Sequence, residues 1–432
     1  MTMSKLRSLE YYLSDLCQHL GHVNRHHNFC DYLKGLLLIE GRKSVEPMAA
    51  ALDPVNTRSR HQALHHFVAD SPWSDQRILD KAWQWVDSKI PATEQRYWVV
   101  DDTGIPKKGK HSVGVSHQYC GQLGKTCNCQ VAVSVSLASK AASIPVAWQL
   151  YLPKTWIEDR DRCAAVGVPQ EMTFTSKTEI ALKQLAQCFD REIPKGIVLA
   201  DSGYGHDHAF REGLDKLSLS YVVGVRSNTS VWAPGVVPVI PRPMRAKGRQ
   251  PIRIKYSEGH RPESVRVISD DLDDSVWEFT EWREGTNDTL GSWFTALRVH
   301  AAHRDNTRGS LRPEQWLLIE WLEDEPKPTK YWLSNLPEST TLMQLVYTAK
   351  MRWHIERDYQ ELKDELGLNH YEGRNWRGFH HHATQCTAAY AYLVAQRIEA
   401  SKGLKKNSAK RKKLTVPSDY IVRGSPEIAT AC

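Results

Sequence analysis

Two short apolar segments of this chain each end at an aspartate that is closely followed by glycine. Residues 97–100 run into Asp101, and residues 196–200 run into Asp201. Apolar runs of this length are typical of strands covered on both faces. Ligands gather at the carboxyl ends of strands in open α/β sheets, so these two acids form a candidate site. For either aspartate alone, a turn or helix-capping role is the alternative, because the residue type suits both.

The patterns around these segments alternate between strand and helix. Strict alternation of apolar residues predicts a strand over 130–139. The further predicted elements are a strand at 144–152, helices at 177–189 and 208–217, and a strand at 220–225. The order of three strands, helix, strand, helix, strand predicts an α/β fold. It is that of a ribonuclease-H-like mixed sheet with helices on both faces.

Changes in composition and in hydrophobic pattern along the chain predict four parts. Residues 1–95 are expected to form a helical N-terminal domain, which either contacts DNA or packs as a cap. Residues 96–226 and 336–400 would form the ribonuclease-H-like core, interrupted by a β-rich insertion at 227–335 that contains frequent proline and glycine. The end, 401–432, is a basic tail, for which solvation and DNA contact are the two interpretations.

Composition restricts the compartment and the partners. The chain has 432 residues and a formal net charge of +7, a modest excess that suits a polyanionic partner. It lacks an apolar run of about 18 residues and the apolar block of a signal peptide at residues 1–20, so we expect no membrane span and a cytoplasmic protein. The nine cysteines are scattered and odd in number, which favours free or buried thiols over a disulfide framework. Cys120, Cys127 and Cys129 are close in sequence, but no second pair of zinc-type spacing accompanies them.

A third block of interest covers residues 352–363. A helix turns each residue by about 100°, so Arg352, Glu356 and Lys363 would share one face. The neighbouring stripe is apolar and consists of Met351, Ile355, Tyr359, Leu362 and Leu366. Such a helix is expected to pack on the sheet with Glu356 at the border of the buried face. The alternative is an amphipathic surface helix with intrahelical ion pairs.

Together the three blocks resemble the DDE transposases of bacterial insertion sequences, in particular the subgroup with a β-strand insertion before the glutamate. The third block of that family reads Tyr, two residues, Arg, three residues, Glu, six residues, Lys. Arg352, Glu356 and Lys363 match this spacing, whereas Ala349 stands where the family has tyrosine. Further similar segments are 101–109, 112–115, 118–121, 200–205 and 331–337, so the resemblance extends over about residues 45–400.

The resemblance implies that Asp101, Asp201 and Glu356 are the catalytic carboxylates and bind two Mg²⁺ or Mn²⁺ ions per site. Two such cations stabilise the attacking and leaving oxygens of a phosphodiester transfer. Asp102 is the alternative to Asp101 as first ligand, and the two cannot easily face one site because side chains alternate along a strand.

Four basic residues are candidates for contacts to DNA. The resemblance assigns Arg352 and Lys363 to phosphates beside the metal site. Lys107 and Lys108 follow the first aspartate and would hold the DNA backbone, with a solvated turn as the alternative. Four tryptophans of the insertion are candidates for stacking on a flipped base, although core packing suits each of them: Trp232, Trp277, Trp282 and Trp293.

The function that these expectations imply is cutting and joining of double-stranded DNA at terminal inverted repeats and at a target. We expect a homodimer on DNA, because two ends must be brought together. Two alternatives stay open at this point. One is a structure-specific nuclease on the same fold, and the other is a non-catalytic DNA-binding protein derived from a transposase.

Overall fold

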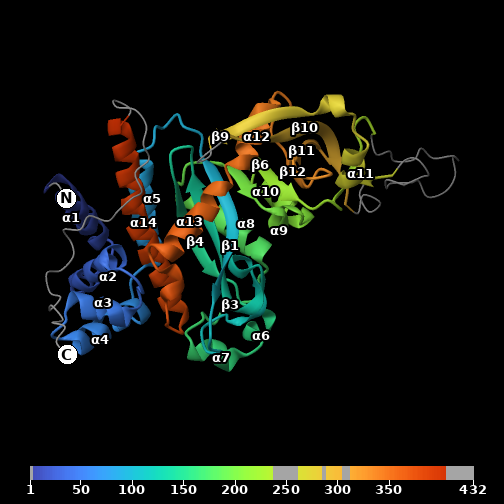
Figure 1. The fold of residues 1–432 in the computed structure, drawn as a ribbon. Helices are drawn as coiled ribbons and strands as arrows, with labels where there is room; N and C mark the ends of the chain where they lie inside the picture. Colours follow the sequence, from blue (N-terminus) through green and yellow to red (C-terminus); the bar gives the residue numbers. More distant parts are fainter. Residues whose placement is uncertain (1–2, 237–260, 285–288, 304–311, 405–432) are drawn as a thin grey trace, which may run out of the picture. The chain divides into compact units, whose positions relative to one another are not determined.

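The computed structural model describes residues 3–236, 261–284, 289–303 and 312–404 (Figure 1). Contacts divide the chain into two compact units. Unit 1 consists of Met1–Arg96, Asp102–Ile193 and His354–Cys432, and unit 2 consists of Tyr97–Asp101 and Pro194–Trp353. Strand β1 (Tyr97–Pro106) begins in unit 2 and ends in unit 1. The predicted segments therefore cut across the two units, since the predicted core contributes to both.

Unit 1 combines helices with an antiparallel set of strands. Strand β3 (Lys125–Ala138) pairs antiparallel with β2 (Ser116–Cys120) and with β4 (Ser143–Leu150). The helices are α1 (Met3–Cys17), α2 (His26–Leu38), α3 (Val45–Leu52), α4 (Thr57–Ala69), α5 (Asp75–Asp87), α6 (Lys154–Ile157), α7 (Arg160–Ala165), α8 (Lys177–Asp190), α13 (Trp353–Asp364) and α14 (Trp376–Leu404). Helix α8 packs on β3, and α5 and α14 pack on β4. Residues 129–138 of β3 are all buried, as expected for a covered strand.

The long helix α14 holds the N-terminal helices of unit 1 together. It packs against α2, α4 and α5. His381 and His382, both buried in α14, reach those helices and the loops beside them. The two ring nitrogens of His381 lie 3.0 Å from the carbonyls of Val68 and Trp73, and His382 bonds the hydroxyl of Tyr32 at 2.8 Å. His381 and His382 thus connect α14 to the N-terminal helices of unit 1.

Unit 2 is built on a mixed sheet. The strand order is β1-β5-β6-β12-β11-β10-β7-β8. Strand β9 pairs with the first part of β10, from Thr289 to Phe294, whereas β7 pairs with its last two residues. Strands β1, β5 and β6 are parallel, and β12 joins β6 antiparallel. The elements that follow β1 are β5 (Ile197–Ala200), α9 (Ser202–Gly205), α10 (His208–Lys216), β6 (Tyr221–Val225), β7 (Ser230–Trp232), β8 (Glu263–Ser264), α11 (Val265–Asp270), β9 (Glu278–Glu284), β10 (Thr289–Ala301), β11 (Glu314–Trp321), β12 (Lys330–Ser334) and α12 (Leu342–Lys350).

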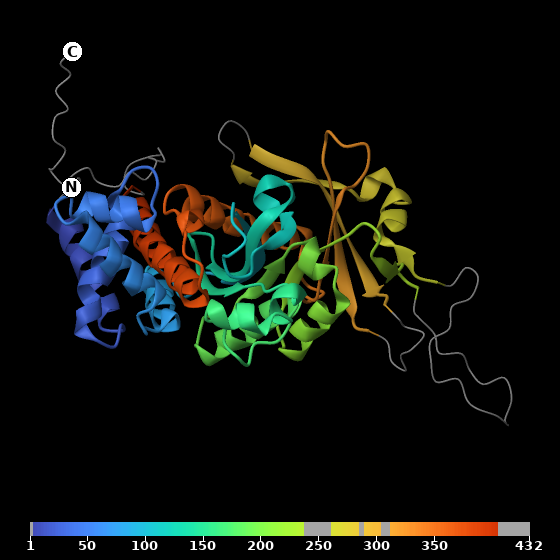
Figure 2. The ribbon, with the colours of Figure 1, turned by 90° about the horizontal axis from the view of Figure 1, so that it is seen from below.

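The β-rich insertion extends the sheet of the core strands in unit 2. Register partners Leu333 and Val223 join β12 to β6, and the yellow and orange strands continue from there (Figure 2). Val225 of β6 lies in one buried cluster with Leu317 and Leu333 of the insertion. The insertion therefore shares both hydrogen bonds and apolar core with the strand that precedes it.

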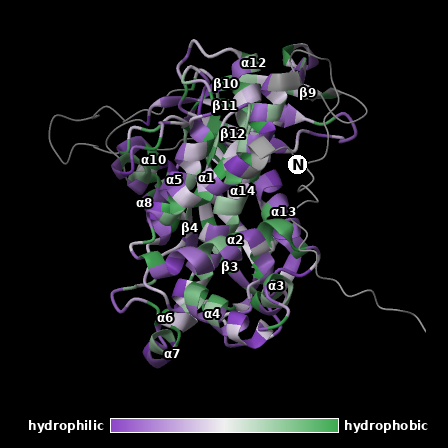
Figure 3. Ribbon diagram, turned by 90° about the vertical axis from the view of Figure 1, so that its left-hand side faces the viewer, coloured by the Kyte–Doolittle hydropathy of each residue, from purple (hydrophilic) through white to green (hydrophobic). Residues whose placement is uncertain are grey.

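The fold class predicted from the sequence is confirmed. Along the chain the elements β1, β3, β4, α8, β5, α10 and β6 follow the predicted order, and the β-rich and N-terminal helical segments are present. Among the described residues no helix is long and apolar enough to cross a membrane, and α14 mixes hydrophilic with hydrophobic positions (Figure 3). Most of the predicted basic tail, from residue 405 onward, lies outside the described residues.

Candidate active site

Asp101 and Asp201 follow neighbouring positions of two parallel strands in unit 2. The register of β1 and β5 pairs Val100 with Ala200, so the two aspartates follow paired positions where the parallel pairing ends. Asp201 is the first residue after β5, whereas Asp101 lies within β1, which continues to Pro106, so the prediction that this strand stops at Asp101 was wrong. Neighbouring strands lie about 4.8 Å apart, which sets the scale of the spacing between the two backbones. Val100 and Ala200 are at most 1% exposed, so buried strands fix both positions. The structure thus brings these two predicted residues together.

The carboxylate of Asp201 caps the short helix α9. Its Oδ1 accepts the backbone N–H groups of Gly203 at 2.9 Å and Tyr204 at 3.3 Å. Capping orients the carboxylate and satisfies two backbone donors at the start of the helix. No partner of Oδ2 is found among the described residues. The capping role anticipated as the alternative is therefore real, and it leaves one oxygen for a ligand.

Two glycines let strand β6 approach the turn that carries Asp201. A Cβ built on Gly205 would lie 2.2 Å from the carbonyl oxygen of Gly224. A Cβ on Gly224 would lie 2.9 Å from the amide nitrogen of Ser202 and 3.2 Å from the carbonyl carbon of Asp201. Real Cβ atoms do not approach backbone so closely, so any side chain at either position would displace the turn.

Arg352, predicted to bind phosphate, is paired with Asp101 in unit 2. Its Nη1 lies 3.0 Å from Oδ2 of Asp101. Both side chains are partly exposed, at 25% for Arg352 and 17% for Asp101. A guanidinium at this distance offsets the negative charge of the carboxylate.

Asp102 has a different partner, which lies in unit 1. Its Oδ2 lies 2.8 Å from Nζ of Lys177, at the start of helix α8. Strand alternation turns adjacent side chains to opposite faces. The separate partners of Asp101 and Asp102 agree with the expectation that the two carboxylates do not face one site.

Glu356 is an exposed residue of α13 in unit 1, whereas the apolar stripe beside it is buried. The predicted stripe residues Met351, Ile355, Tyr359, Leu362 and Leu366 are all at most 8% exposed. Glu356 itself is exposed. The buried stripe agrees with the predicted packing and leaves Glu356 at the surface of unit 1. The predicted common face of Arg352, Glu356 and Lys363 is wrong, because Arg352 precedes α13 and Lys363 is only 5% exposed.

The same helix is anchored by Asp358, which the sequence analysis did not single out. Its carboxylate accepts hydrogen bonds from Ser143 at 2.5 Å and Tyr390 at 3.0 Å. Complete burial raises the pKa of Asp358 to about 7. The available signal was its position between Ile355 and Leu362 at helical spacing, which places it within the buried stripe.

The predicted lysines occupy different environments within unit 1. Lys363 is 5% exposed, and its Nζ donates to the carbonyl of Gly104 at 3.1 Å and to Gln122 at 3.0 Å. Lys107 donates to the carbonyl of Tyr371, and burial lowers its pKa to about 8. Lys108 is exposed. Of the three, Lys108 is the one whose side chain lies open to solvent.

The four tryptophans of the insertion also differ in exposure. Trp232 and Trp277 are buried, at 0% and 8%. Trp282 is partly buried, with Nζ of Lys350 lying 4.5 Å from its ring centroid. Trp293 is 40% exposed, and its ring centroid lies 5.5 Å from that of Phe279. Trp293 is therefore the member of this set with the most surface for a stacking partner.

The chain belongs to the DDE superfamily endonucleases, since the model of that family matches residues 15–289, more than half of the chain. The match includes Asp101 and Asp201 and ends before Glu356. A relative, the probable transposase for insertion sequence element IS701 of Microchaete diplosiphon, is 31% identical over 168 residues. Those residues are 39% of this chain and 41% of the relative, so less than half of the relative's length is matched. The resemblance to DDE enzymes found in the motifs is confirmed.

Proposed function

We propose that this protein is a DNA transposase that cuts and joins phosphodiester bonds at the ends of an insertion sequence. Asp101, Asp201 and Glu356 serve as its catalytic carboxylates. The observation that carries the proposal is the pairing of Val100 with Ala200, which sets two aspartates side by side in a chain of the DDE family. Glu356 is supported by its family spacing and by its exposure on α13.

The donor set fits hard divalent cations. Carboxylate oxygens are the ligands that Mg²⁺ and Mn²⁺ prefer, and Asp201 keeps Oδ2 beyond its capping bonds. When bound, two such ions supply charge stabilisation to the attacking and leaving oxygens of the phosphodiester. The capping bonds to Oδ1 hold the Asp201 carboxylate in one orientation, which spares the cost of ordering it during the reaction.

Arg352 has two roles in this proposal. Before DNA binds, it neutralises Asp101 across 3.0 Å and so limits repulsion among the acids. When DNA binds, the guanidinium exchanges the carboxylate for a phosphate, which it engages through two parallel hydrogen bonds. Lys108 adds an exposed charge for the DNA backbone, whereas Lys107 and Lys363 position the segments that carry them through carbonyl contacts.

The DNA partners are the terminal inverted repeats of the element and a target duplex, and the protein acts as a homodimer at the nucleoid. Two ends must be processed together, which requires two active sites. Native mass measurement with end DNA tests the dimer, and a complex of one chain per DNA end that never pairs would contradict it.

The decisive experiment uses DNA with matching element ends, Mg²⁺ and the full chain. Wild type should nick the ends and then join a pre-cleaved 3′-hydroxyl end to a target strand. Glu356→Gln should abolish both steps, whereas Asp364→Asn, an exposed acid of the same helix, should retain them. Cleavage without joining would identify a structure-specific nuclease instead. Equal DNA binding with neither reaction in wild type would identify a non-catalytic DNA-binding protein.

A further inference from the structure

Three thiols gather on the β2–β3 hairpin of unit 1. Cys120 ends β2, and Cys127 and Cys129 lie two residues apart on β3. Their sulfur atoms all lie within 4.8 Å of one another. The sequence spacing alone did not favour a metal site, because no second pair of zinc-type spacing accompanies these cysteines.

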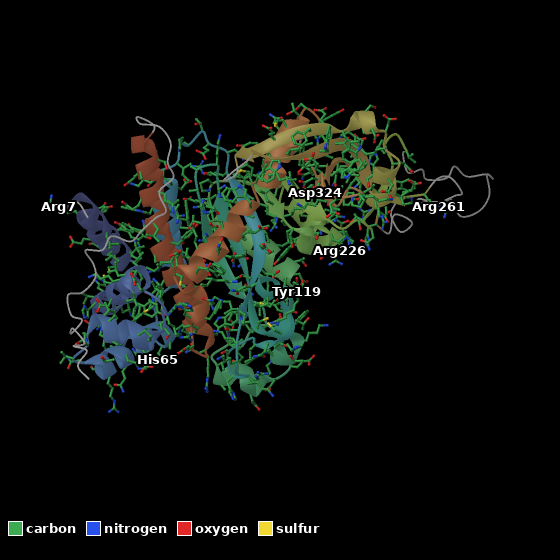
Figure 4. The ribbon with its side chains drawn as sticks, in the orientation of Figure 1. Arg7, His65, Tyr119, Arg226, Arg261 and Asp324 are labelled. Atoms are coloured by element: carbon green, nitrogen blue, oxygen red, sulfur yellow. The ribbon has the colours of Figure 1, made fainter. Side chains whose placement is uncertain are left out.

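The register of the hairpin explains the cluster. Gln118 pairs with Cys127, and directly opposite residues of an antiparallel pair point to the same side. Cys120 is two residues beyond Gln118 and Cys129 two beyond Cys127, so alternation turns all three thiols to one face. Tyr119, labelled in Figure 4, has the opposite orientation and is 62% exposed.

The face that carries the thiols is enclosed by the neighbouring elements of unit 1. Cys120 and Cys129 are 0% exposed and pack with Val131. A Cβ on Gly104 would lie 2.6 Å from Sγ of Cys120, so the absent side chain makes room for that sulfur. Lys363 donates to the carbonyl of this same glycine at 3.1 Å. The cluster is thus built into the contact between the hairpin and the end of β1.

We propose that Cys120, Cys127 and Cys129 bind one Zn²⁺ as thiolates. Zinc–sulfur bonds of about 2.3 Å in tetrahedral geometry require sulfurs about 3.8 Å apart. The observed limit of 4.8 Å needs only a small contraction to reach that value. Among the described residues the group contains no fourth Cys, His, Asp or Glu, so a water molecule completes the tetrahedron.

The ligand type distinguishes this proposed Zn²⁺ ion from the Mg²⁺ or Mn²⁺ ions proposed at the carboxylates. Thiolates are soft ligands that select zinc, whereas Mg²⁺ and Mn²⁺ prefer oxygen. Binding replaces the three thiol protons with one Zn²⁺ and releases the protons to solvent, which makes affinity rise with pH. The bound ion would tie β2 to β3 and hold the hairpin against Gly104. The role we assign to it is structural.

The test is metal titration of the full chain after removal of metal under reducing conditions. Co²⁺ should produce a thiolate-to-metal charge-transfer band at one equivalent, and Zn²⁺ should abolish the band by displacement. Hydrogen exchange within residues 116–129 should slow when Zn²⁺ binds. Absence of the band in wild type would overturn the proposal, and so would a disulfide within the cluster detected by alkylation and mass measurement of the chain as purified.

Two substitutions make the assignment specific. Cys127→Ser alters the partly exposed member of the cluster and should weaken Zn²⁺ binding at least about 100-fold, because losing a group that only hydrogen-bonds to a metal ligand already costs about 10- to 100-fold. Cys163→Ser is the matched control: this buried thiol donates to the carbonyl of Trp156 at 3.1 Å, a bond that serine keeps. Equal Zn²⁺ affinity of the two variants would place the ion elsewhere. Circular dichroism confirms that both variants are folded.

Discussion

The guanidinium of Arg352 holds the carboxylate of Asp101, with Nη1 3.0 Å from Oδ2. An arginine expected at DNA phosphates is therefore bound to one of the acids expected at the metal. If Asp101 binds a cation and Arg352 binds DNA, as proposed, each event would release the other residue from this pair, so we expect the two to favour each other.

Loss of this arginine should be visible in the salt dependence of DNA binding. Arg352→Gln removes one phosphate contact, so the slope of log binding constant against log salt should fall by about 0.9. Arg357→Gln is the control, because Arg357 lies one turn further along and is held by Glu361 at 2.9 Å. Filter binding or fluorescence anisotropy at several salt concentrations measures the slope. An unchanged slope in Arg352→Gln would show that its guanidinium stays with Asp101 on DNA.

The dual use of Asp201 as cap and ligand can be separated by substitution. Asparagine caps a helix about as well as aspartate, so Asp201→Asn should keep the fold. It loses a charged ligand, and we expect cleavage to slow at least about 100-fold, or about 3 kcal/mol. Asp207→Asn changes another aspartate cap of unit 2, which accepts from Ala209 at 2.9 Å, and should cleave at close to the wild-type rate. Similar cleavage rates for the two variants would show that Asp201 only caps the helix and does not act as a ligand.

Asp358 should make unit 1 less stable as pH rises. Burial raises its folded pKa to about 7 from an unfolded value of about 3.9. Because the folded state binds the proton more tightly, this stabilisation is complete below about pH 4 and is lost as pH rises through 7. It amounts to at most roughly 4 kcal/mol. Thermal unfolding from pH 4 to 8 should show a smaller decline in Asp358→Asn than in wild type, and parallel curves would refute the assignment.

The buried histidines should act in the opposite direction. Burial lowers the pKa of His381 and His382 to about 4, against about 6.5 when unfolded. Their contribution is present above pH 6.5 and is lost as pH falls through 4, because the unfolded chain takes up the protons. His382→Gln should lower the melting temperature at pH 7.5 and reduce its fall on acidification. The exposed His65, labelled in Figure 4, provides the control His65→Gln, which should follow the wild-type profile.

Local patterns were sufficient to predict most strands and helices and the end of β5 at Asp201, but not the end of β1, which continues past Asp101 to Pro106. Residues 97–100 and 196–200 were apolar on both faces, and the strands they form are largely buried. The stripe beside Glu356 was visible at helical spacing and is buried in the structure. These features depend on interactions between near neighbours in sequence, which periodicity records directly.

The features that the sequence did not reveal all depend on long-range register. The bond between Asp101 and Arg352 joins residues 251 positions apart, and the pairing of β12 with β6 joins the insertion to the core sheet. Cys120 meets Cys129 only because of the hairpin pairing. The sequence did not distinguish Asp358 from the other acidic residues of its helix, because its partners Ser143 and Tyr390 lie far away in the chain. Such contacts leave no periodic trace in one sequence.

Because Gly205 packs closely against Gly224, substitutions at these glycines bear on whether a copy of such a gene encodes an active protein. A single added methyl group at either glycine would push aside the turn that presents Asp201, while every acidic residue stayed in place. Under the proposed function, an element copy with such a substitution would lose activity although its three acids were intact. Surveys that score element copies by those acids alone would then overcount the active ones.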